Sequence, residues 1–240
     1  MGNDLGSRTS EWFVPKFGPP GLRTFMGLLF LPYTGMVLAF VVLGSLLAPR
    51  IFWDRLIALE VIYFFALGIG AHALDALGSR SRKPWGSVFS RPQLWIFALL
   101  SLALAYGIAA YYMVVYVPLL WVPAVVEGFF VFAYNMEWFG GRFHSDNWFA
   151  FSWGFVPPVA GYIMQTNSLL FEVVLVGAAT GLFSIVEIKA SRPYKALKQR
   201  INGLTEEDGA AMSRYEMILK GISLGVILLT LGLLFRRVLS

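Results

Sequence analysis

The chain has 240 residues, of which 58% are hydrophobic and 14% are charged, and its net charge is +5. A soluble domain carries about 25% charged residues, so this composition excludes a soluble globular protein and predicts an integral membrane protein. The sequence lacks cysteine and has two histidines, which excludes disulfides, thiol chemistry and a histidine-rich metal cluster. We assign the positive charge to cytoplasmic loops beside membrane lipids, and we expect no nucleic-acid partner.

Apolar runs of membrane-spanning length recur after a polar leader at residues 1–24. A helix needs about 20 residues to cross a bilayer, so the apolar stretch 94–138 must be divided, and we divide it near 114–118. Residues 25–240 are therefore predicted to form one all-α domain, a polytopic membrane bundle of about seven helices around a central cavity. The predicted spans are about 25–47, 56–74, 94–113, 118–138, 148–164, 169–188 and 221–235.

The distribution of lysine and arginine predicts the orientation of the chain. If the N-terminus is cytoplasmic, fifteen of the 19 basic residues fall in inside segments, and four fall outside. This positive-inside bias predicts a protein of the plasma (cytoplasmic) membrane with its C-terminus outside. It also places three sizeable loops, 75–93, 138–147 and 189–220, on the cytoplasmic face.

The last of these loops has helical signals of its own. Residues 194–201 suit a short amphipathic helix ended by Asn202 and Gly203. Thr205, followed by three acidic residues, suits the start of a second helix that runs toward Lys220. Such a hairpin either covers the mouth of the cavity or lies as a linker in the membrane interface.

The first loop follows an apolar run that ends with an acid. His72 and Asp75 share one helix face, and the cations Arg80, Arg82 and Lys83 come directly afterwards. A carboxylate opposite several cations suits a metal-bound diphosphate, because the acid holds the metal and the cations hold phosphate oxygens. The alternative interpretation is an ordinary positive-inside loop without a site.

Acids inside the predicted spans are costly and usually face a cavity or a partner. Glu127 and Asn135 lie eight residues apart, so they share one face of the fourth span. Ser184, Glu187 and Ser191 share a face in the same way at the end of the sixth span. In the fifth span, Pro157 and Pro158 are expected to break the helix, which is tolerated where the freed carbonyls line a cavity or are buried in protein.

The second loop, 138–147, leads into another dense polar stretch. Arg142, His144, Asp146 and Asn147 follow one another closely, and His144 and Asp146 suit acid–base or metal roles. The alternative is that Asp146 or Ser145 only caps the next helix and that His144 is interfacial.

These features resemble the UbiA family of intramembrane prenyltransferases. That family carries N-x-x-x-D-x-x-x-D after its second helix, and Asp75 stands near the position of its second aspartate, followed by a basic stretch. Leu67 and Ala71 replace the asparagine and the first aspartate. The family's D-x-x-x-D motif after the sixth helix corresponds to Glu187 and Ser191, followed by Arg192-Pro193. UbiA-like members usually have nine spans.

The resemblance implies transfer of a prenyl group from a prenyl diphosphate to an aromatic, quinone-precursor or lipid acceptor, with Mg²⁺. An intramembrane cyclase of the same fold and a non-catalytic lipid-binding subunit are the alternatives, because motif aspartates are missing. The residues assigned to catalysis are Asp75, His144, Asp146 and Glu187. The residues assigned to metal binding are Asp75, Glu137, Asp146 and Glu187. The residues assigned to substrate binding are His72, Arg80, Arg82, Lys83, Glu127, Asn135, Arg142, Asn147, Lys189, Arg192 and Tyr194.

Overall fold

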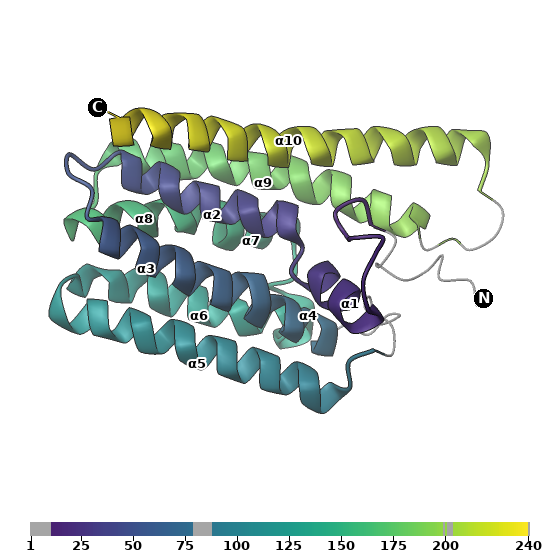
Figure 1. Cartoon of the computed structure of the whole chain (residues 1–240), viewed down its shortest axis with the longest axis horizontal. Helices are drawn as coiled ribbons and strands as arrows, with labels where there is room; N and C mark the ends of the chain where they lie inside the picture. The colour runs from purple at the N-terminus through teal and green to yellow at the C-terminus, as the bar shows by residue number, and fades with distance from the viewer. Residues whose placement is uncertain (1–10, 79–87, 199, 201–203, 240) are drawn as a thin grey trace.

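The chain folds into a bundle of long helices that run side by side (Figure 1). The structure is a computed structural model that describes residues 11–78, 88–198, 200 and 204–239, and within these ranges it contains helices and no strand. The elements in chain order are α1 (Pro20–Leu28), α2 (Leu31–Leu46), α3 (Trp53–Tyr63), η3 (Phe64–Ala71), α4 (His72–Gly78), α5 (Arg91–Val115), η4 (Pro118–Leu120), α6 (Trp121–Asn135), η5 (Phe139–Gly141), α7 (Asp146–Phe149), η6 (Ala150–Phe155), α8 (Val156–Thr166), α9 (Phe171–Lys198) and α10 (Glu206–Leu239).

The described part of the chain has five helical segments that are long and apolar enough to cross a membrane. The count becomes six if α1 and α2, which are bent by 40° relative to each other, form one span. The expected division of the long apolar stretch is confirmed, since α5 ends at Val115 and η4 begins at Pro118. The stretch predicted as the fifth span is helical as α7, η6 and α8, but it is not one of these five or six segments.

The second predicted span is longer than its apolar run. Helices α3, η3 and α4 follow one another without a break from Trp53 to Gly78, and η3 is a π-helical segment. The helix therefore carries His72 and Asp75 to its end. A Cβ atom on Gly78 would lie 2.3 Å from the carbonyl oxygen of Asn135, so glycine permits the ends of α4 and α6 to touch.

The prediction that Pro157 and Pro158 break their helix is wrong. The π-helical segment η6 leads into α8 without interruption, and both prolines lie in the first turn of α8. Proline cannot donate to the carbonyl one turn earlier, which leaves the carbonyl of Gly154 without its usual partner. The hydroxyl of Thr180, on α9, donates to this oxygen at 2.8 Å. A neighbouring helix thus replaces the missing hydrogen bond.

The prediction of a hairpin of two separate helices after the sixth span is also wrong. Helix α9 runs to Lys198 without a break, even through Pro193, so residues 194–198 are not a separate short helix. The expected start of the next helix is confirmed: Thr205 accepts from the amide of Asp208 at 3.1 Å, and Asp208 accepts from the amide of Thr205 at 3.2 Å. That helix, α10, then continues to Leu239 as one element. Asn202 and Gly203 lie outside the described residues.

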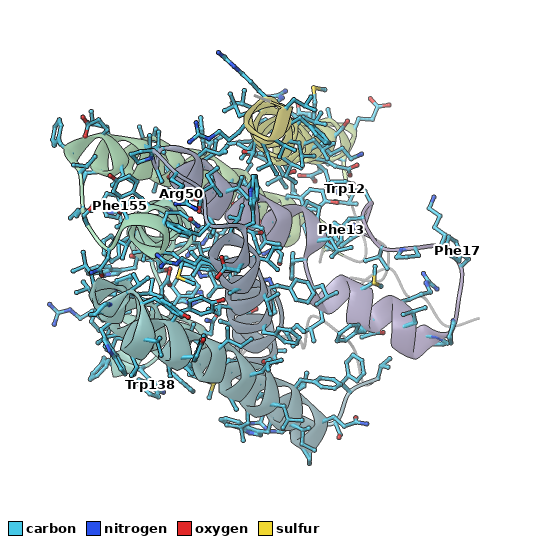
Figure 2. All side chains as sticks on the ribbon, turned by 60° about the vertical axis from the view of Figure 1, so that its left-hand side comes forward. Trp12, Phe13, Phe17, Arg50, Trp138 and Phe155 are labelled. Carbon is cyan, nitrogen blue, oxygen red and sulfur yellow. The ribbon has the colours of Figure 1, made fainter. Side chains whose placement is uncertain are left out.

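The N-terminal segment lies against α9 and α10 (Figure 2 labels Trp12 and Phe13 there). Glu11 is 5% exposed, and its carboxylate lies 3.0 Å from the hydroxyl of Tyr194 and 3.0 Å from the ammonium of Lys198. Phe13 packs on Phe30 and Tyr33. These contacts hold the segment over the junction of α1 and α2.

Candidate functional site

Four helices bring polar side chains to one end of the bundle, which we call the polar end. Helix α4 ends there with Asp75, α6 ends there with Tyr134, α7 begins there with Asp146, and the last turns of α9 carry Arg192. Arg192, Asp75 and Asp146 are the charged groups that act electrostatically on the Tyr134 hydroxyl. The structure therefore brings Asp75, Asp146 and Arg192 close to one hydroxyl.

Asp146 is paired with two cations from α9. Its carboxylate lies 2.8 Å from Lys189 Nζ and 3.0 Å from Arg192 Nη1, and its side chain is 17% exposed. The cations are much more open, at 68% for Lys189 and 44% for Arg192. Ser145 is the residue that caps α7, since its hydroxyl accepts from the amide of Trp148 at 3.4 Å. Asp146 is thus a charged partner of α9.

His144, in the loop before α7, contacts Tyr134 at the polar end. Its ring stacks on Tyr134 with the centroids 4.4 Å apart, and its Nδ1 lies 2.9 Å from the Tyr134 carbonyl oxygen. Nδ1 in the protonated form donates to that oxygen, which leaves Nε2 to act as an acid or a base. The histidine is therefore oriented by α6 and half-buried.

A row of aromatic rings runs under the polar groups. Phe30 contacts His72, His72 contacts Trp153, Trp153 stacks on Phe149, and Phe149 contacts Tyr134, with centroid distances of 4.9, 5.2, 5.5 and 5.9 Å. These rings come from the α1–α2 junction, α4, η6, α7 and α6. The row ends at Tyr134, the residue on which the charged groups act.

Phe30 reaches this row through an unusual backbone conformation. Its φ of 44° lies in the left-handed region, which costs a non-glycine residue about 1 kcal/mol or more. The bend between α1 and α2 occurs at this residue and turns its ring onto His72.

Glu187 is the most deeply placed acid at the polar end. Its side chain is 4% exposed, and Ser184 and Ser191, which the sequence placed on the same face, are also buried. Lys195 is the charged group that acts on it, one helix turn beyond Ser191. The ammonium of Lys195 in turn lies 5.0 Å from the centre of the Phe30 ring.

Asp75 differs from Asp146. It is half-buried and makes no hydrogen bond or ion pair with another described residue. The basic residues that follow it, Arg80, Arg82 and Lys83, lie outside the described residues.

The described residues contain no group of three or more histidine, aspartate or glutamate side chains that could hold a metal ion. Asp75, Glu137, Asp146 and Glu187, which the sequence assigned to one metal, therefore do not form such a group between them. Mg²⁺ commonly binds through only one or two carboxylates together with substrate phosphates.

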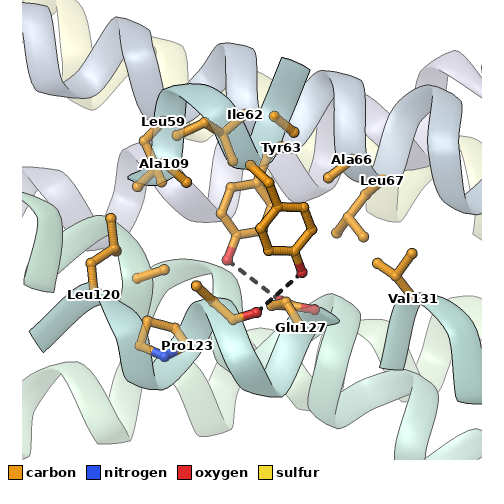
Figure 3. Close-up of a pocket in the computed structure, with 14 residues that line it drawn as sticks. Leu59, Ile62, Tyr63, Ala66, Leu67, Ala109, Leu120, Pro123, Glu127 and Val131 are labelled. Carbon is orange, nitrogen blue, oxygen red and sulfur yellow. Dashed lines mark hydrogen bonds between the residues drawn. The ribbon is translucent and has the colours of Figure 1, made fainter. Parts of the chain in front are cut away.

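The remaining predicted residues lie in several environments. Arg142 and Asn147 are exposed, whereas Asn135 is buried and its amide donates to the carbonyl of Val131 at 2.8 Å. The Tyr194 hydroxyl is occupied by the N-terminal segment. Glu127 lies away from the polar end, in the cavity of Figure 3, which none of the predicted acids and cations of the polar end lines.

Phe30 and Lys195 were not among the residues that the sequence pattern assigned to the site. The four-residue spacing of Glu187, Ser191 and Lys195 was a signal for the last of these, because it places the three residues on one helix face. Phe30 had no such signal, since its role depends on helices that meet only in the folded bundle.

No family model, no curated protein and no solved structure matches this chain. The function therefore has to be argued from the residues of the polar end.

Proposed function

We propose that this protein is a UbiA-like membrane prenyltransferase, which transfers a prenyl group from a prenyl diphosphate to an aromatic, quinone-precursor or lipid acceptor. One observation supports the proposal above the others: Arg192, Asp75 and Asp146 act electrostatically on Tyr134, and Tyr134 is also the end of a row of aromatic rings. Lys189 adds a second cation, which pairs with Asp146. A prenyl diphosphate has the same two parts, a strongly anionic end and an apolar chain.

In this proposal the cations of α9 hold the diphosphate. Arg192 and Lys189 are both substantially exposed, so phosphate oxygens reach them without a rearrangement of the helices. A guanidinium binds two phosphate oxygens at once, and charge-assisted hydrogen bonds of this kind are about twice as strong as neutral ones. Arg80, Arg82 and Lys83 are proposed to add to this positive charge.

The aromatic row is proposed to receive the first part of the prenyl chain. Departure of diphosphate leaves positive charge on the allylic carbon, and the faces of aromatic rings attract a nearby cation. The buried rings of Trp153 and Phe149 also keep water away from this carbon. His144 is oriented to take the proton that the acceptor loses when the new bond forms.

Asp75 is the carboxylate that would hold a Mg²⁺ ion together with the diphosphate oxygens. When bound, the ion neutralises charge on the leaving diphosphate. Asp75 suits this task because it has no ion pair within the described chain, whereas Asp146 already has two.

The proposal includes the topology. We propose that the helix from Asp146 to Thr166 is a further span, which brings the total to seven, with the polar end and the N-terminus cytoplasmic and the C-terminus outside. Proximity of Arg237 to the carbonyls of Ala48 and Pro49 supports a common side for the C-terminus and the α2–α3 connection.

The deciding experiment is Asp75→Asn in the purified full chain, with turnover of a prenyl diphosphate measured in the presence and absence of Mg²⁺. We expect the variant to lose at least about 100-fold in rate, comparable to loss of one strong transition-state interaction. Asp54→Asn is the control, because this exposed acid lies at the opposite end of the same helix. Wild-type rates in Asp75→Asn contradict the proposal.

A second candidate is a non-catalytic lipid-binding subunit, which the neutralisation of Asp146 by Lys189 and Arg192 favours. This candidate predicts that wild type binds a prenyl diphosphate without consuming it. A joined product supports the transferase, and a cyclised chain that forms in excess chelator supports the cyclase of the same fold.

A further inference from the structure

A cavity lies inside the bundle, away from the polar end. Its volume is about 50 Å³, and small or apolar side chains of α3, η3, α5, η4, α6 and α8 line almost all of it (Figure 3). Its polar lining consists of Tyr63, Tyr106 and Glu127, and no lysine or arginine of the described chain lines it. The cavity therefore has one polar corner in otherwise apolar surroundings.

The polar corner has an unfilled hydrogen-bonding position. The Tyr63 hydroxyl donates to Glu127 Oε1 over 3.4 Å, and the Tyr106 hydroxyl donates to the Ala124 carbonyl at 3.3 Å (dashed lines in Figure 3). Glu127 Oε2 is buried and has no hydrogen-bond partner among the described residues. A buried polar atom without a partner is rare and costly, so a ligand that hydrogen-bonds to Oε2 would gain free energy.

Gly128 provides the space for the Tyr106 hydroxyl in this arrangement. A Cβ atom on Gly128 would lie 2.1 Å from the hydroxyl oxygen of Tyr106. Only glycine at this position lets the Tyr106 hydroxyl lie against α6, beside the turn that carries Glu127.

Both α5 and α6, two of the long apolar helices, line the cavity. Helices α5 and α6 have few close contacts with each other beyond their connection at η4, and each packs mainly on the α3–η3–α4 helix or on α8. Tyr106, which lies between them, is 37% exposed. An apolar molecule can therefore enter sideways from the bilayer.

The cavity is separate from the polar end of the bundle. Glu127 precedes Asn135 by eight residues, which is about 12 Å along α6 at 1.5 Å per residue. Tyr63 precedes Asp75 by twelve residues, or about 18 Å along its helix.

We propose that this cavity is a second ligand site, which binds the hydroxyl end of an apolar alcohol or phenol from the bilayer. The hydroxyl donates to Glu127 Oε2, and the hydrocarbon lies in the gap between α5 and α6. A hydroxyl suits the corner because it both donates and accepts, whereas a ketone or an ether only accepts. An anionic headgroup does not suit it, because the lining supplies no cation.

The test uses a long-chain alcohol that carries a diazirine, with the purified full chain in nanodiscs, and maps the cross-links by mass spectrometry. We expect saturable labelling of residues 105–109 and 120–131. The unlabelled alcohol should compete about tenfold better than its methyl ether, since loss of one hydrogen bond of about 1.4 kcal/mol changes affinity tenfold.

Glu127→Leu removes the acceptor, so we expect the alcohol and the ether to compete equally in this variant. Glu172→Leu, at an exposed acid of α9, should retain the wild-type preference. Equal competition in wild type, or labelling spread evenly over the lipid-facing helices, overturns the proposal and indicates only lipid or water in the cavity. The comparison of the alcohol with its methyl ether in wild type tests the proposal even if Glu127→Leu does not fold.

Discussion

The contact between α2 and α8 offers a sharp test of the fold, through Gly44→Ala. A Cβ atom at Gly44 would lie 1.8 Å from the carbonyl oxygen of Pro158, whereas real Cβ contacts under 3.0 Å essentially never occur. The obstacle is backbone, so the two helices must separate by at least 3.0 − 1.8 = 1.2 Å. Overpacking of this kind costs about 3 kcal/mol.

The same shift is expected to reach the polar end. Helix α8 continues from η6, which carries Trp153 in the aromatic row, so displacement of α8 moves that ring. Misplacement by about 1 Å can lower a rate about 100-fold, and on the proposed function Gly44→Ala should lose activity to that degree.

The measurement is the apparent unfolding midpoint of the detergent-purified protein, followed by near-ultraviolet circular dichroism. Gly107→Ala is the matched control, because a Cβ atom there has no neighbour within 4 Å in the described chain. Alanine is the better helix former, so the control should gain about 0.5–1 kcal/mol. Equal midpoints for the two variants would refute the close contact of α2 with α8.

Two further predictions concern hydrogen bonds that hold helix segments in place. Thr180→Val removes the donor to the Gly154 carbonyl that Pro158 leaves unpaired, and it should lower the unfolding free energy by about 1–3 kcal/mol, with Thr180→Ser close to wild type. Thr205→Ala removes the cap of α10 and should cost about 1 kcal/mol. Faster amide exchange confined to the first turn of α10, at residues 206–209, would report this loss, and unchanged exchange there would contradict the role of the cap.

The sequence was sufficient for features that depend on local chemistry. Hydropathy identified the helical membrane bundle, and the need for about 20 residues per span located the connection after Val115. The hydroxyl of Thr205 followed by acids identified the start of α10, because a capping site is complete within four residues. The face shared by Ser184, Glu187 and Ser191 followed from helical spacing alone.

Other features depend on groups that meet only after folding. The helix survives Pro157 and Pro158 because Thr180 on another helix replaces a hydrogen bond, which no local pattern shows. Helices α9 and α10 continue past the predicted ends of their apolar runs, since hydropathy reports what faces lipid and not where a helix stops. The partners of Asp146 come from α9, far along the chain.

The pairing of Asp146 with two cations of α9 suggests a role that its sequence context did not indicate. The sequence suggested an acid–base or metal role for Asp146, with capping of α7 as the alternative, but in the structure the carboxylate lies between Lys189 and Arg192 at 2.8 and 3.0 Å. A carboxylate in this position occupies the place that an anionic ligand would take. On the proposed function, Asp146 therefore competes with diphosphate for the two cations when the site is empty.

This competition predicts that Asp146→Asn binds inorganic pyrophosphate more tightly than wild type. Partly exposed ion pairs contribute at most about 1 kcal/mol each, so release of two cations, about 2 kcal/mol together, should improve affinity by up to about 30-fold. Isothermal titration with and without Mg²⁺ measures the effect, and Asp208→Asn, which affects an exposed pair with Arg200, should match wild type. A metal ligand behaves in the opposite way: its loss weakens binding, and only when Mg²⁺ is present. If Asp146→Asn instead binds pyrophosphate more weakly, and only when Mg²⁺ is present, Asp146 is a metal ligand. That result would refute the proposed competition between Asp146 and diphosphate.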